Sequence, residues 1–188
     1  MQYLKKNNLG GNLLAMELPS AELYIRWLQA NILLPMQMSI PPWRYASMSN
    51  QSGDVLYTAR RIFKVRRVLA KLLIKALEEA RVDHMPIARP LWMNYDHYDD
   101  HDVLGVLPLL TDDEYMVGEC LLVAPILEEG KLNRNVVFPE GEWIPCMGGA
   151  NRTPVITSQG NLTILVRTLS IIDDPPCFRR SDIADCSL

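Results

Sequence analysis

The chain has 188 residues, and 48% of them are hydrophobic, so it is long and apolar enough to bury a globular core. Its formal net charge of −3 gives no general electrostatic reason to bind nucleic acid or an anionic membrane. The longest apolar runs, such as GVLPLL and CLLVAPIL, are far shorter than the roughly 18 residues that a membrane-spanning helix needs. The N-terminal MQYLKKNNLGGN has no apolar core behind its lysines, unlike a secretory signal. We therefore expect a soluble globular chain.

The first predicted element is a helix over residues 21–34, because apolar residues recur there at helical spacing. Ser20 stands at the N-cap position, where a hydroxyl accepts a hydrogen bond from the first turn. The Pro41-Pro42 pair in MQMSIPPWRY cannot continue a helix. It predicts an extended turn that displays Trp43.

A longer amphipathic helix is predicted between about residues 55 and 81. Its apolar residues recur in steps of three and four, at Ile62, Val65, Leu69, Leu72, Leu73, Ala76, Leu77 and Ala80. Basic residues run along the same segment, at Arg60, Arg61, Lys64, Arg66, Arg67, Lys71 and Lys75. We interpret this basic strip as a solvated face, because the chain is negative overall and Glu78 and Glu79 follow the strip. A surface for nucleic acid, acidic lipid or calmodulin is the alternative.

The run HMPIARPLW, residues 84–92, is short and apolar like a buried strand. A helix that leads directly into such a strand forms an αβ unit, whose strands are usually parallel and buried on both faces. Arg89 interrupts this run, and Pro90 ends strand pairing. We therefore expect Arg89 to lie where the strand leaves the sheet, with a partner for its charge.

The pattern changes after the polar segment NYDHYDDHD. Short runs rich in valine, isoleucine and leucine now alternate with turn residues, in EYMVGECLLVAPIL, RNVVFP, GEWIP, TPVIT and LTILVR. These runs predict antiparallel strands that form a small β-sandwich. We therefore divide the chain into residues 1–111, which hold αβ units, and residues 112–188, which form the β domain.

Two sets of side chains raise the question of a metal site. His97 and His101 are four residues apart, and Asp96, Asp99, Asp100 and Asp102 surround them. Because this segment is wholly polar and follows a strand end, we interpret it as a solvated loop; a metal site and a substrate contact are the alternatives. The four cysteines form no C-x-x-C pair, so a zinc site is not expected, and Cys120 is interpreted as a buried thiol. We expect no cofactor and no metal.

Several segments resemble glycoside hydrolase family 31. ELYIRWLQA, PIARPLW and EYMVGECLLVAPILEEGKLNRNVVFPEGEW are similar, in the same order, to parts of the C-terminal third of that family. ELYIRWLQANILLPMQMSIPPWRY is most similar to an animal, α-galactosidase-like branch. The resemblance implies that residues 1–111 are the C-terminal end of a (β/α)8 TIM barrel and that residues 112–188 are an antiparallel β-sandwich. The tail IIDDPPCFRRSDIADCSL does not follow the family pattern and is either a divergent sandwich edge or a misjoined tail.

The resemblance implies retaining hydrolysis of terminal α-linked sugars, which requires two carboxylates about 5–5.5 Å apart. In the family both are aspartates from earlier barrel strands, upstream of the segment that NNLGGN resembles, so no catalytic residue is assigned in this chain. The resemblance places two segments on the active-site face of the barrel. They supply the predicted substrate-binding residues Gln37, Ser39, Trp43 and Arg89. For Trp43 and Arg89 the alternatives are packing under the loop and capping of the barrel rim.

Two functions compete. The chain is a fragment of a family 31 hydrolase whose intact form binds an α-glycoside carbohydrate, or it is a non-catalytic remnant that binds carbohydrate or protein. The apolar stripe of the 55–81 helix is expected to face a barrel sheet that this chain mostly lacks, so we predict self-association or chaperone binding of the fragment. The family suggests the secretory pathway or the lumen of the endoplasmic reticulum, although no targeting signal marks this chain.

Overall fold

The computed structural model describes residues 18–35, 40–45, 52–94, 113–146, 154–157, 163–168 and 177–187. The helices are α1 (Ala21–Ala30), α2 (Ser52–Val68) and α3 (Ala70–Asp83), with 3-10 turns η2 (Pro42–Tyr45), η3 (Leu91–Met93) and η4 (Ala184–Cys186). The strands are β1 (Ala88–Arg89), β2 (Tyr115–Val117), β3 (Leu121–Val123), β4 (Asn133–Phe138), β5 (Gly141–Pro145), β6 (Val155–Thr157), β7 (Thr163–Thr168) and β8 (Cys177–Arg180). None of the described helices is both long and apolar enough to span a bilayer.

The strands form two antiparallel sheets. One has six strands in the order β1-β2-β3-β8-β5-β6, and the other is the β4-β7 pair. All the pairings between described strands are antiparallel, as the turn-separated runs after residue 112 predict. The small antiparallel β architecture is therefore confirmed, whereas the described residues do not show the end of a (β/α)8 barrel.

The prediction of a parallel strand in residues 84–92 is wrong. Ala88 and Arg89 pair antiparallel with Val117 and Met116 of β2, so β1 is an edge strand of the same sheet as β2 and β3. Pro90 limits β1 to two residues because proline has no backbone N–H for the ladder. The division between residues 111 and 112 stays a prediction.

Helix α1 begins at its predicted N-cap residue, and the longer predicted helix is divided in two. The Ser20 hydroxyl accepts a hydrogen bond from the Leu23 N–H at 3.1 Å, which caps α1. The helix predicted over residues 55–81 is two helices, α2 and α3, which meet at the fully buried Leu69. Arg66 donates to the carbonyls of Ile32 and Leu34 just after α1. At least one member of the basic strip therefore serves helix packing.

The apolar stripe of α2 and α3 is buried, so the prediction that it stays exposed is wrong. Ile62, Val65, Leu69, Leu72 and Leu73 are each at most 8% exposed, and they belong to a core that includes α1 and one face of the six-stranded sheet. Of the predicted stripe, Leu77 alone is exposed, at 46%. The stripe packs on one face of the six-stranded sheet, which presents apolar side chains on both of its faces.

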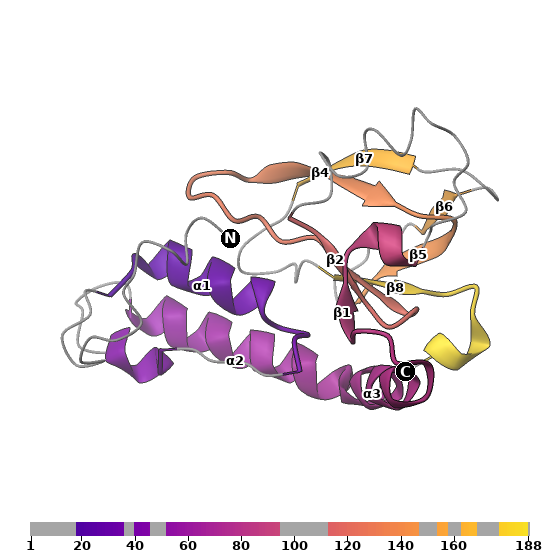
Figure 1. Cartoon of the computed structure of the whole chain (residues 1–188). Helices are drawn as coiled ribbons and strands as arrows, with labels where there is room; N and C mark the ends of the chain where they lie inside the picture. The colour runs from indigo at the N-terminus through magenta and orange to yellow at the C-terminus, as the bar shows by residue number, and fades with distance from the viewer. Residues whose placement is uncertain are drawn as a thin grey trace.

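The six-stranded sheet lies between two layers (Figure 1). The helices cover one face, and β4 with β7 lies on the opposite side. Along β3, Leu121 and Val123 join the helix-facing core, while Leu122 and Ala124 join a second core with Val136, Val137 and Phe138 of β4. This alternation follows from the two-residue period of a strand.

The C-terminal tail is an integral part of the fold. Strand β8 lies between β3 and β5, near the middle of the six-stranded sheet. Cys120 forms a disulfide with Cys186, which corrects the interpretation of Cys120 as a free buried thiol. The two cysteines are 66 residues apart, so sequence spacing alone could not pair them.

Candidate functional site

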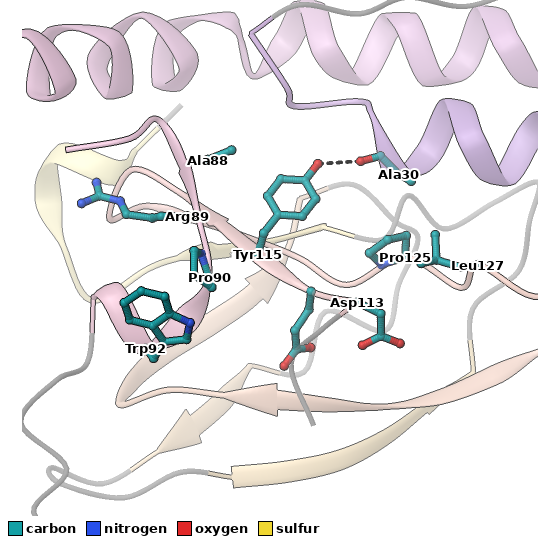
Figure 2. A pocket seen from close by; sticks show the side chains of 10 residues that line it. Ala30, Ala88, Arg89, Pro90, Trp92, Asp113, Tyr115, Pro125 and Leu127 are labelled. Atoms are coloured by element: carbon teal, nitrogen blue, oxygen red, sulfur yellow. Dashed lines mark hydrogen bonds between the residues drawn. The ribbon is translucent and has the colours of Figure 1, made fainter. Parts of the chain in front are cut away.

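A groove of about 430 Å³ lies beside the short strand β1. We call it the β1 groove, and its lining residues are Ala30, Ala88, Arg89, Pro90, Trp92, Asp113, Glu114, Tyr115, Pro125 and Leu127. Figure 2 shows Trp92 and Pro90 on one side of this view, and Asp113, Pro125 and Leu127 on the other. Four segments, at residues 30, 88–92, 113–115 and 125–127, therefore build the groove.

A side-chain hydrogen bond and a 3-10 turn shape the walls of the β1 groove. The Tyr115 hydroxyl donates to the Ala30 carbonyl at 2.7 Å, which joins the end of α1 to β2 (Figure 2). Burial raises the pKa of Tyr115 well above its usual value, so its hydroxyl keeps the proton that it donates. Next to Pro90, η3 buries Leu91 completely and leaves the indole of Trp92 51% exposed.

Asp113 and Glu114, which line the groove, form a charged cluster with Arg134. The Arg134 guanidinium contacts Asp113 Oδ1 at 2.6 Å and Glu114 Oε2 at 3.3 Å. It also donates to the backbone carbonyls of Asp113 and Pro125, at 3.0 and 2.7 Å. Arg134 thus ties the start of β2 to the segment that follows β3, and it positions the Asp113 carboxylate at the groove.

Glu114 is the buried member of this cluster. Its carboxylate accepts hydrogen bonds from the backbone N–H of Val137 at 3.2 and 3.4 Å. Burial raises the pKa of Glu114 to about 8, although Arg134 and the Val137 N–H favour the ionised form. The Glu114 side chain is fully shielded from solvent. It therefore cannot reach a substrate carbon, and the pair it forms with Asp113 is not a glycosidase nucleophile and acid.

Arg89 has the partner that its position requires. Its guanidinium lies 3.8 Å from Glu79 Oε2 of α3, and the Arg89 side chain is 9% exposed. In Figure 2 the guanidinium extends away from Asp113. Gly118 makes room for this pair: its φ is +57°, and an added Cβ would lie 2.8 Å from Glu79 Oε2. Arg89 thus lines the groove while its charge joins β1 to α3.

The structure describes two of the four predicted substrate-binding residues, Trp43 and Arg89. Arg89 lines the β1 groove, whereas Trp43 lies on η2, is 69% exposed and does not line it. Gln37 and Ser39 lie outside the described residues, as do the histidines and aspartates of residues 96–102. The substrate-contact roles of Gln37, Ser39, Trp43 and Arg89 therefore stay predictions.

Sequence reasoning missed most of the β1 groove. Trp92 was treated as part of a strand, and Asp113 was not singled out. The available signal was the acidic pair Asp113-Glu114 before an apolar strand, with Arg134 in a later strand as a possible counter-charge. Within the described ranges, no three His, Cys, Asp or Glu residues gather closely enough to hold a metal ion.

Residues 84–180 match the family model described as the glycosyl hydrolase family 31 C-terminal domain. Myogenesis-regulating glycosidase of Mus musculus is 36% identical over 141 residues, which cover 73% of this chain and 18% of that protein. The SITS-binding protein of Tetronarce californica is 32% identical, over 70% of this chain and 17% of its own length. The chain therefore spans less than a fifth of the length of these curated relatives.

A solved structure supports the fold independently. The cycloalternan-degrading enzyme from Trueperella pyogenes, in complex with isomaltose, superimposes with a TM-score of 0.70 at 23% identity, over 90% of this chain and 24% of that chain. The family model covers more than half of the sequence, including β1 and the central strand β8. The expected animal branch is also supported, by the match to myogenesis-regulating glycosidase. The chain belongs to glycoside hydrolase family 31, and residues 84–180 correspond to the C-terminal domain of that family.

Proposed function

We propose that this chain is the C-terminal part of a retaining family 31 glycosidase that hydrolyses terminal α-linked sugars in carbohydrate metabolism. The observation that carries the proposal is the 36% identity to a glycosidase over 73% of the chain. In this proposal both catalytic aspartates belong to a barrel region that this chain does not contain. The chain supplies the C-terminal domain and a set of helices that pack on it.

The Cys120–Cys186 disulfide supports a place in the secretory pathway, because disulfides persist in oxidising compartments. The α-galactosidase-like branch makes an α-galactoside the first substrate to test. Gln37, Ser39 and Trp43 are proposed to contact the sugar in the intact enzyme, since an amide, a hydroxyl and an indole face suit a hydroxylated ring.

The proposal is tested by assaying two proteins on aryl α-galactoside and aryl α-glucoside substrates. One is the isolated chain, and the other is the chain joined to the upstream region of its gene. We expect turnover from the longer protein alone. Turnover by the isolated chain, abolished by changing any one of Asp96, Asp99, Asp100 or Asp102, would overturn the proposal.

A non-catalytic role is the second candidate. It is favoured by the 32% identity to the SITS-binding protein, a relative whose name describes binding and not hydrolysis. In that case neither protein turns over a glycoside, yet the chain still binds carbohydrate or protein. The case for self-association or chaperone binding of the fragment is weakened, because six of the eight residues of the apolar stripe are buried.

A further inference from the structure

The β1 groove presents an aromatic face on a rigid turn. The backbone N–H of Met93 donates to the Pro90 carbonyl at 3.1 Å, and Asn94 N–H donates to the Leu91 carbonyl at 3.0 Å. The Asn94 side chain also donates to the Gly118 carbonyl at 3.1 Å, which fastens this turn to the end of β2. The backbone that carries Trp92 is therefore fixed, while about half of the Trp92 surface faces solvent. A single exposed aromatic residue is ordinary, so the groove needs a second feature to be a binding site.

That second feature is an oriented carboxylate. The Asp113 side chain is 47% exposed, and Arg134 holds its Oδ1 at 2.6 Å. Among the described residues no hydrogen bond to Asp113 Oδ2 is present, so this oxygen is available to a ligand's hydroxyl group. Arg134 is itself fixed by the carbonyls of Pro125 and Asn135, at 2.7 and 2.9 Å. The acceptor is thus preorganised, which lowers the entropic cost of binding.

The charges of the groove are already paired within the protein. Arg134 neutralises Asp113, and Arg89 faces Glu79. No unpaired charge among the described lining residues favours an anionic or cationic ligand. Pro90, Pro125 and Leu127 add apolar wall, and the volume of about 430 Å³ lies in the range of small-molecule sites. The groove suits a neutral ligand with an apolar face and a rim of hydroxyl groups.

We propose that the β1 groove binds a neutral pyranose sugar, which packs its C–H face on Trp92 and donates hydroxyl hydrogen bonds to Asp113. This inference goes beyond the proposed function, since it concerns binding by residues of this chain and requires no turnover. A pyranose ring meets both requirements, because its C–H groups lie on its faces and its hydroxyl groups lie around its edge. A charged sugar phosphate fits less well, because it would bring an anion toward Asp113.

The test uses the full 188-residue chain and four probes: methyl α-glucopyranoside, methyl α-galactopyranoside, isomaltose and, as a charged comparison, glucose 6-phosphate. Saturation-transfer NMR identifies the sugar protons that touch the protein, and isothermal titration calorimetry gives the affinity of each variant, including those that lack Trp92. We expect saturation to concentrate on the ring protons of one face. Trp92→Ala should weaken binding at least tenfold, whereas Trp92→Phe, which keeps an aromatic face, should weaken it by less than about fivefold. Asp113→Asn should weaken it about tenfold, because a hydrogen bond to a charged acceptor is lost.

Tyr57→Ala is the matched control, since Tyr57 is a comparably exposed aromatic residue on α2, outside the groove. It should leave the affinity unchanged. If Trp92→Ala does not fold, as judged by loss of its cooperative thermal transition, Trp92→Phe and Asp113→Asn carry the test. The proposal would be overturned if the folded chain bound no sugar, or if Trp92→Ala bound sugar as tightly as the unmodified chain. Tighter binding of glucose 6-phosphate than of methyl α-glucopyranoside would also overturn it. An inactive intact protein whose C-terminal chain still binds sugar would contradict the proposed function alone.

Discussion

The two faces of the six-stranded sheet are buried by different kinds of structure. On one face, α1, α2 and α3 pack against Val117, Leu121 and Val123. On the other, β4 packs against Leu122 and Phe178, and Phe138 meets Phe178 edge to face at 4.9 Å between ring centroids. The helix-facing core also holds the disulfide, whereas the β4-facing core holds the buried Trp143. The same strands therefore serve two cores.

Because both faces of the sheet are covered, its strands lack the alternation of apolar and polar residues that usually marks an antiparallel strand. A sheet with one solvated face alternates apolar and polar residues, whereas a sheet covered on both faces has continuous apolar strands. The run Leu121–Ala124 is fully buried. All four residues are apolar because Leu121 and Val123 belong to the helix-facing core, while Leu122 and Ala124 belong to the β4-facing core. Continuous apolar strands are typical of parallel sheets, but here a second layer on an antiparallel sheet produces them.

The largest expected effect comes from the disulfide on the helix-facing side. Cys186→Ser opens a loop whose ends are 66 residues apart, so the unfolded state gains conformational entropy. The loop-entropy relation gives a loss of about 4 kcal/mol in the free energy of unfolding. Urea denaturation of the purified oxidised chain measures this loss. Cys146→Ser is the control for removal of a buried cysteine that is not in a disulfide. Equal losses in the two variants would show that Cys120–Cys186 contributes nothing as a cross-link.

The next effect tests the packing of the helices on the sheet. Leu69→Ala empties a fully buried position at the α2–α3 junction, and we expect a loss of about 3 to 4 kcal/mol. Leu77→Ala, at the exposed end of the same predicted stripe, should cost less than about 1 kcal/mol. Both values come from denaturant titrations. Similar small losses at the two positions would mean that the stripe does not pack on this sheet.

These helices also show what the sequence can predict. Helical spacing identified α1 and most of α2 and α3, and turn residues identified the strands after residue 112, because both signals are local. The partner surface of the stripe was not predictable, since it includes β8, which belongs to the tail that the sequence analysis set apart from the family pattern. That interpretation is wrong for β8, because the family model extends through residue 180. The sequence predicted that Arg89 needs a counter-charge, but it did not identify Glu79 of α3 as the residue that supplies it. Asp113 was missed because its partner Arg134 is distant in sequence and contacts it only after folding. Trp92 was missed because the turn that carries it is fastened to Gly118 by Asn94, a contact that also forms only on folding.

The third effect concerns pH and the β4-facing side. The folded-state pKa of Glu114, about 8, lies above its ordinary value of 4.5, so the folded state holds a proton that the unfolded state releases. The associated stability is fully present below about pH 4.5 and is lost as pH rises through 8. Relative to Glu114→Gln, the free energy of unfolding of the unmodified chain should fall by roughly 3 kcal/mol between pH 5 and 8.

Urea denaturation at both pH values measures this change, and Glu119→Gln is the control because Glu119 is an exposed carboxylate nearby in sequence. The Glu119→Gln variant should follow the pH dependence of the unmodified chain. A Glu114→Gln variant that follows it as well would show that Glu114 titrates alike in the folded and unfolded states, with its burial offset by Arg134 and Val137.

The smallest effect separates backbone strain from crowding beside Trp143. Gly130 and Gly141 both have positive φ, 76° and 128°, so an alanine is strained at either position. An added Cβ at Gly130 would meet no atom within 4 Å, whereas at Gly141 it would lie 2.5 Å from Arg180 Nη2. That guanidinium lies 5.6 Å from the centre of the Trp143 ring, and it also pairs with Asp182. We expect Gly130→Ala to cost about 1 kcal/mol and Gly141→Ala about 2 kcal/mol. Thermal unfolding of both variants measures the difference. Equal costs would mean that Arg180 moves aside freely, and that its position over Trp143 adds little to the β4-facing core.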